Sequence, residues 1–197
     1  MLIRRLVLRT VALCSVASCA SQSEPTMPRD PRVSLDASEA VQYSASGGGI
    51  VGFSAVAGAT DGHFTFNASV TGDGKVRGRF HQTRSRDGLL VEFSGDVTCL
   101  TIDPVRKRAR IGGMITANNS TDPAFLTTNH EIGDDVWFRV QDIGQGGTAD
   151  QRSTTYGFKP ILVDTSEQYC ALPFDGLPWW NPATIFPLAR GTISVND

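Results

Sequence analysis

The chain has 197 residues, with 18 basic and 20 acidic side chains and a formal net charge of −2. This balance argues against a nucleic-acid partner, because the phosphate backbone demands a cationic surface. Twenty glycines and ten prolines separate short apolar runs, which favours many turns over long helices.

The first eighteen residues have the pattern of a secretory signal. Three arginines within the first nine residues precede an apolar stretch over residues 10–18, which is too short to remain as a transmembrane span. Cys19 ends the sequence Val-Ala-Ser-Cys, which resembles the lipobox of bacterial lipoproteins. The resemblance implies cleavage before Cys19, lipidation of its thiol and membrane contact through that anchor. The alternative is an ordinary signal peptide cut near Ala20, which leaves the protein secreted.

The mature chain is expected to begin with a tether. Residues 19–46 are rich in Ser, Pro and Ala and have no sustained apolar period, so we expect a lipidated Cys19 followed by a flexible segment. Residues 47–197 then form a single domain. Without residues 1–18 the chain carries 15 basic and 20 acidic side chains, a net charge of −5.

Short alternating apolar runs separated by turn residues fill this domain. The pattern is typical of an all-β fold, either an antiparallel β-sandwich or a partly closed barrel built from hairpin meanders. The predicted strands are Ile50–Ala55, His63–Thr71, Lys75–Ser85, Leu89–Ile102, Ala109–Ala117, Asp135–Ile143, Tyr156–Val163 and Gly191–Asn196.

Two turns fix the register of the middle strands. The three-residue loop at 72–74 pairs residues whose numbers sum to 146, which places Phe66 opposite Phe80 on the inner face. The two-residue turn at 87–88 is of type I′ and pairs residues whose numbers sum to 175, which places Phe80 opposite Gly95. Because a slip by one residue would invert every side chain, the agreement of the two turns predicts a three-stranded meander.

Cys99 and Cys170 are the cysteines that remain after the signal and Cys19. An even pair in an oxidising compartment is typical of a disulfide, and two buried thiols are the alternative. The register set by the second turn pairs Val76 with Cys99 and directs Cys99 into the core.

A basic row follows the outer face of the third predicted strand. Its members are Lys75, Arg77, Arg79 and His81. The row is compatible with an anion-binding stripe, but Asp96 and Glu92 lie across from it in the same register. We therefore favour ordinary cross-strand ion pairs over a binding site.

Asp142 and Asp150 flank a glycine-rich loop. Calcium takes several oxygen ligands, and a flexible loop supplies backbone carbonyls beside carboxylates. Calcium is therefore the single cofactor for which the sequence offers candidate ligands, and a solvated turn is the alternative. The histidines have no cysteine or carboxylate spaced to complete a zinc site.

Trp179 and Trp180 stand next to each other in a proline-rich connection before the last predicted strand. Adjacent indoles on a loop present rigid faces that stack on a sugar ring or an apolar ligand. The alternative, which we favour, is that they plug the open end of the β domain.

No catalytic signature is present: the chain has no Gly-x-Ser-x-Gly elbow, no phosphate-binding loop and no dinucleotide fingerprint. Short glycine-containing motifs, among them Gly74-Lys-Val-Arg-Gly78, Ala109-Arg-Ile-Gly-Gly113 and Gly191-Thr-Ile-Ser-Val195, resemble a family of small secreted or lipid-anchored all-β bacterial proteins without an assigned biochemical function. The resemblance extends over about residues 47–197 and implies export and an all-β fold.

These observations predict an exported, lipid-anchored, non-catalytic β domain of the bacterial cell envelope, with a structural role or a carbohydrate or protein ligand. The alternative is a small extracytoplasmic enzyme or a barrel that holds a small ligand. A filled interior favours the first hypothesis, and a deep cavity with convergent polar groups favours the second.

Overall fold

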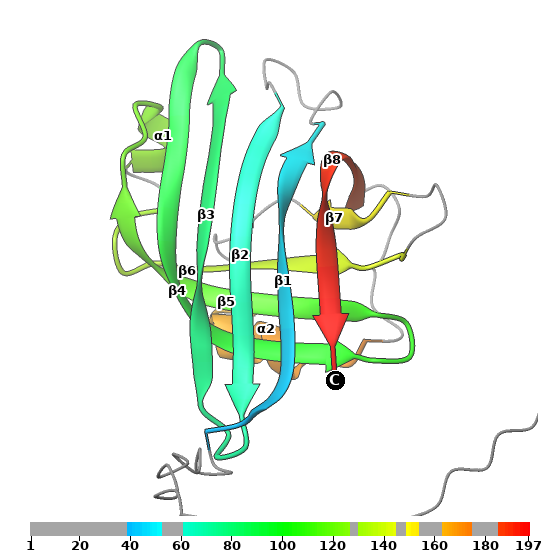
Figure 1. Cartoon of the computed structure of the whole chain (residues 1–197). Helices are drawn as coiled ribbons and strands as arrows, with labels where there is room; N and C mark the ends of the chain where they lie inside the picture. Colours follow the sequence, from blue (N-terminus) through cyan, green and yellow to red (C-terminus); the bar gives the residue numbers. More distant parts are fainter. Residues whose placement is uncertain (1–38, 53–60, 127–129, 145–148, 154–162, 175–184) are drawn as a thin grey trace, which may run out of the picture. The chain divides into compact units, whose positions relative to one another are not determined.

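Eight antiparallel strands pair in chain order, and the last closes onto the first to form a barrel (Figure 1). The computed structural model describes residues 39–52, 61–126, 130–144, 149–153, 163–174 and 185–197. The strands are β1 (Val41–Val51), β2 (Gly62–Thr71), β3 (Val76–Arg86), β4 (Leu89–Asp103), β5 (Arg108–Asn118), β6 (Asp135–Gln141), β7 (Gln151–Ser153) and β8 (Ile185–Asn196), and two short helices are α1 (Pro123–Leu126) and α2 (Ser166–Ala171). The predicted all-β class is confirmed, and the architecture is the closed barrel.

Both predicted hairpin registers are confirmed. β2 and β3 pair from His63 opposite Thr83 to Val70 opposite Val76, and β3 and β4 pair from Arg86 opposite Leu89 to Arg79 opposite Asp96. The turn between β3 and β4 has positive φ at both central residues, 51° at Asp87 and 80° at Gly88, as a type I′ turn requires. Local turn chemistry therefore determines the meander.

The first strand begins earlier than the sequence pattern indicates. β1 starts at Val41, inside the segment 19–46 that we predicted as a tether, and pairs with β2 on one side and β8 on the other. The middle of this strand consists of small residues instead of alternating large side chains. Ala45 is buried in the core, while Ser44 and Ser46 face outward. A strand built from serine, alanine and glycine has no hydrophobic period to detect.

The other differences lie near the C-terminus. β8 begins at Ile185 and not at Gly191, and β7 is a three-residue strand at 151–153. Of the predicted strand Tyr156–Val163, all but the last residue lies outside the described residues, and Val163 is buried outside any strand.

Apolar side chains fill the interior between the described strands. Phenylalanines from β2, β3, β4 and β6 meet there edge to face, with ring centroids 5.3 Å apart for Phe66 and Phe138 and 6.4 Å apart for Phe80 and Phe93. Valine, isoleucine, leucine and alanine side chains from β1, β5 and β8 complete the same buried cluster. Close packing of this kind is the dominant stabilising contribution to a barrel of this size.

β4 bends and so belongs to two layers of the barrel. Its first part pairs with β3, and its second part pairs with β5 behind the long strands in Figure 1. Register shifts between Ser94 and Gly95 and between Val97 and Cys99 mark β-bulges, which bend a strand and increase its twist. The second bulge overturns our inward placement of Cys99: the extra residue reverses the alternation, so Leu100 enters the core and Cys99 faces α2.

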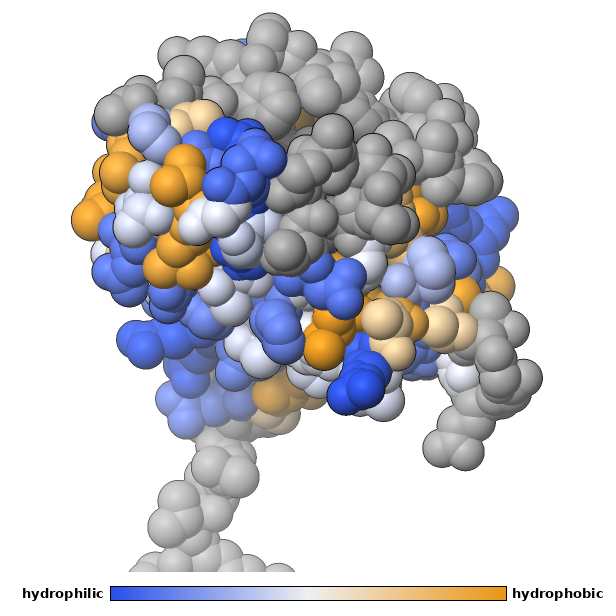
Figure 2. Space-filling view, turned by 90° about the horizontal axis from the view of Figure 1, so that it is seen from above, coloured by the Kyte–Doolittle hydropathy of each residue, from blue (hydrophilic) through white to orange (hydrophobic). Residues whose placement is uncertain are grey.

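The end of the barrel that carries the β3–β4 turn has apolar residues in small groups among hydrophilic ones (Figure 2). Leu89 and Leu90 beside the turn and Leu126 on α1 are exposed. Scattered apolar groups of this size are ordinary on a protein surface. Among the described helices, none combines the length and hydropathy needed to span a bilayer.

Candidate functional site

Three of the predicted site residues cannot be placed. The lipidation candidate Cys19 and the two tryptophans, Trp179 and Trp180, lie outside the described residues. Lipid anchoring and the choice between a tryptophan plug and a binding platform therefore stay predictions.

The disulfide between Cys99 and Cys170 is present and joins β4 to α2, with Cα atoms 6.2 Å apart. It holds α2 against the outer face of the barrel, behind β5 in Figure 1. The Thr101 hydroxyl donates to the carbonyl of Cys170 at 3.0 Å and adds a polar contact beside the bridge. The bond is a structural clamp between the barrel and its covering helix.

A buried arginine lies beneath the end of α2. The Arg110 guanidinium donates to the carbonyls of Leu172 and Pro173 and lies 4.5 Å from the ring centroid of Phe174. Leu172 is the C-cap of α2 and Pro173 follows it, so the guanidinium satisfies carbonyls at and just beyond the C-terminal end of the helix. Burial lowers the pKa of Arg110. Sequence reasoning missed this residue because arginine is expected on the surface.

Asp142 and Asp150, the calcium candidates, both accept hydrogen bonds from the backbone of β8. Asp150 accepts from the N–H of Ile193 at 2.7 Å, and Asp142 accepts from the N–H of Val195 at 3.2 Å. Their other oxygens accept from N–H groups of the adjoining loop. Along β8, β7 pairs with residues 185–187 and extends no further. Beyond these residues, the two carboxylates accept hydrogen bonds from β8 backbone N–H groups that a neighbouring strand would otherwise accept.

Nothing in this arrangement tests calcium binding, which stays a prediction. Within the described ranges, no three His, Cys, Asp or Glu side chains gather closely enough to hold a metal ion. The residue types that suggested a cation site also suit backbone amides, because an ionised carboxylate accepts strong hydrogen bonds from N–H groups.

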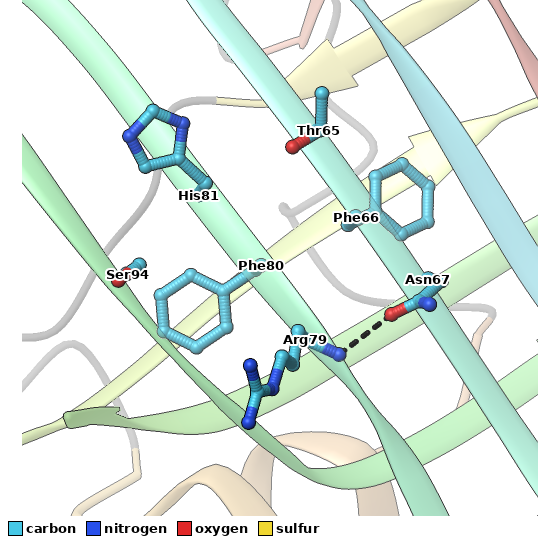
Figure 3. A pocket seen from close by; sticks show the side chains of 7 residues that line it. All are labelled: Thr65, Phe66, Asn67, Arg79, Phe80, His81 and Ser94. Atoms are coloured by element: carbon cyan, nitrogen blue, oxygen red, sulfur yellow. Dashed lines mark hydrogen bonds between the residues drawn. The ribbon is translucent and has the colours of Figure 1, made fainter.

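A hollow of about 470 Å³ opens on the outer face of β2, β3 and β4 (Figure 3). Phe66 and Phe80 point into the core, so their backbone forms the floor. The Asn67 amide oxygen accepts the backbone N–H of Arg79 at 2.7 Å, which fixes the amide across the two strands. The lining consists of Thr65, Phe66, Asn67, Arg79, Phe80, His81 and Ser94.

A second hollow, of about 250 Å³, adjoins the first, and Asn67 lines both. It extends across β1, β2 and the start of β3. Gly78 lies in its wall with φ of 153°, and a Cβ there would be 2.0 Å from the carbonyl oxygen of Asn67, so a side chain is excluded. The other lining residues are Ser44, Ala45, Ser46, Ala68, Ser69 and Arg77. We call the two hollows together the β1–β4 groove.

The predicted cross-strand contacts of opposite-charge residue types beside this groove are confirmed, as an ion pair for Arg79 and as a hydrogen-bond contact for His81. Arg79 Nε lies 3.4 Å from Asp96 Oδ1, and His81 Nε2 lies 3.3 Å from Glu92 Oε1. The Arg79 and Asp96 side chains are 85% and 56% exposed, so water screens their attraction. Arg77 differs from them, because it faces Ser69 and has no acidic partner among the described residues.

The barrel interior also contains a charged side chain. Arg152 on β7 is buried, donates to the Gln82 amide oxygen at 3.0 Å, and lies 4.5 Å from the ring centroid of Phe64 and 4.7 Å from that of Phe138. Burial lowers its pKa to about 9, with a further contribution from nearby Arg84. No periodicity in the sequence marks this residue as internal, because the strand that carries it is three residues long.

His130 is buried between the rings of Phe93 and Phe125, with centroid distances of 4.8 and 4.6 Å. Neither ring nitrogen has a hydrogen-bond partner among the described residues. Burial lowers its pKa to about 4, with a smaller lowering from Arg84 and an opposing effect of Asp134. The imidazole is therefore neutral at pH 7 and acts as an aromatic packing group.

The fold and the groove define a small closed antiparallel β-barrel domain with a polar hollow on its outer face. Comparisons of the chain with models of protein families, with curated proteins and with solved structures find no match. The resemblance drawn from short motifs stays a prediction.

Proposed function

We propose that the protein is an exported, lipid-anchored, non-catalytic domain of the bacterial cell envelope that binds its ligand in the β1–β4 groove. One observation carries this proposal: the interior between the described strands is packed with apolar side chains, while polar groups gather around an open hollow outside. Hydroxyl, amide and guanidinium groups supply the donors and acceptors that orient a polar ligand. The disulfide is compatible with an oxidising, extracytoplasmic location.

The anchor is tested first. We expect the wild-type protein to incorporate a fatty-acid label in a bacterial host and to partition into the detergent phase. Cys19→Ser is expected to abolish both, because the thiol is the acceptor of the lipid. Labelling that persists in this variant contradicts lipidation at Cys19.

The groove is tested with a bulky substitution. Ser69→Trp fills the smaller hollow, and we expect it to lower cosedimentation of the protein with isolated cell walls at least about tenfold, a loss of about 1.4 kcal/mol of binding free energy. Ala171→Trp is the matched control, because Ala171 is exposed on α2, outside the groove lining. Equal binding by wild type and Ser69→Trp contradicts a role for the groove.

A second candidate function is a carrier that holds a small anionic ligand in the interior. The buried Arg152 beside Gln82 and two phenylalanine rings favours it, since a cation among aromatic rings suits an apolar carboxylate. Under this alternative, dodecanoate raises the melting temperature of the wild type but not that of Arg152→Met. Ser69→Trp then leaves the response to dodecanoate unchanged.

A further inference from the structure

We infer that the β1–β4 groove recognises an acidic polysaccharide, with Arg77 and Arg79 as the residues that bind its carboxylates. This inference rests on the proposed function, because it names the ligand class of the same groove.

The geometry places one guanidinium at each hollow. Arg77 lines the smaller hollow and Arg79 lines the larger one. The two residues are two positions apart on β3, so both face outward and their Cα atoms are separated by roughly 7 Å. Asn67 lies between the hollows and contributes to both. A polymer with repeated acidic groups can therefore place successive carboxylates against successive arginines.

The charges around the groove favour an anion on its β1–β2 side. The acidic residues beside the groove, Asp96 opposite Arg79 and Glu92 next to His81, both come from β4. On the opposite side, Arg77 faces the uncharged Ser69, and Arg79 faces the uncharged Asn67. An arginine fork binds a carboxylate through two N–H groups. Arg77, which has no acidic partner within the described part of the chain, can receive one, and the exposed Arg79 can share its donors with Asp96.

The remaining lining identifies a glycan rather than another macromolecule. Its polar side chains are short hydroxyl and amide groups from β1, β2 and β4, which pair with the hydroxyl groups of sugars, and the imidazole of His81 from β3. None of the exposed large apolar side chains of the described residues lines the groove, whereas the centre of a protein interface is apolar and aromatic.

The test uses polygalacturonate and the same polymer with its carboxyl groups reduced to alcohols. Calorimetric titration of the lipid-free mature chain is expected to show binding to the acid polymer and at least about tenfold weaker binding to the reduced one. Arg77→Gln and Arg79→Gln should each weaken binding of the acid polymer about tenfold, since each removes a charge-assisted hydrogen bond.

Two further variants separate an effect of charge on ligand binding from an effect on folding. Asn67→Asp keeps the acceptor for the Arg79 N–H but adds a negative charge between the hollows, so it should weaken binding without lowering the melting temperature. Arg190→Gln removes an exposed arginine of β8 outside the groove lining and should leave binding unchanged.

Failure of the inference is distinguishable from failure of the proposed function. If Ser69→Trp abolishes cell-wall binding while the acid and reduced polymers bind equally, the groove is the ligand site and carboxylate recognition is overturned. If Ser69→Trp leaves binding to cell walls and to polygalacturonate unchanged, both proposals are overturned. If Arg77→Gln and Arg190→Gln weaken polymer binding equally, binding depends only on the net charge of the protein. The assigned roles of Arg77 and Arg79 are then overturned.

Discussion

Replacement of both Cys99 and Cys170 by serine is expected to lower the free energy of unfolding by about 4 kcal/mol, because the bridge closes a loop with a sequence separation of 71 residues. The unfolded chain regains the freedom that this closure removes. The folded chain loses the covalent attachment of α2 to the barrel. Urea unfolding of wild type and double variant, followed by far-ultraviolet circular dichroism, measures the difference.

The matched control is Thr101→Val, which removes the hydroxyl that donates to Cys170 but keeps the bridge. We expect it to cost about 1 kcal/mol, as one partly buried hydrogen bond does. Reduced wild-type protein should reproduce the stability of the double serine variant. A double variant as stable as Thr101→Val would show that the bridge does not constrain the unfolded chain.

Acidification from pH 7 to pH 4 is expected to remove about 3 kcal/mol of stability through His130 alone. Its pKa falls from 6.5 in the unfolded chain to about 4 in the fold, and each unit is worth about 1.4 kcal/mol. Because the unfolded chain binds the proton first, this stability is fully present above pH 6.5, declines as the pH falls and levels off below pH 4. Urea unfolding at a series of pH values measures it.

His130→Phe separates this effect from the titration of the carboxylates. Phenylalanine preserves the stack between Phe93 and Phe125 and cannot take up a proton. The difference in stability between wild type and variant should therefore change by about 3 kcal/mol between pH 7 and pH 4. A difference that is the same at both pH values would show that the imidazole is not held neutral by burial.

The central meander could be predicted because its information is local. The turns at 72–74 and 87–88 each fix one register, and both registers hold in the structure. The prediction failed where β4 contains a bulge, because the inward direction of Cys99 followed from strict alternation. It also missed the start of β1, where burial against two neighbouring strands compensates for the lack of large side chains.

The candidate sites depended on longer-range arrangements. The basic row on β3 was visible in the sequence, but the distinct position of Arg77 follows from its neutral neighbour on β2. Asp142 and Asp150 were recognised as a pair, whereas their bonds to β8 could not be foreseen without knowing that β7 is short. The burial of Arg110 and Arg152 could not be predicted from the sequence, because it depends on elements distant in the chain.

The pairing of β1 with β8 joins the first and last strands of the domain. Among the neighbouring strand pairs this one has the largest sequence separation, so it has the largest loop-closure cost, and such long-range pairing slows folding. Until residues 185–197 are in place, the outer edge of β1 offers unpaired backbone groups to any other extended chain. A chain that ends before β8 therefore loses more than one strand, because its remaining sheet has two open edges through which copies can aggregate.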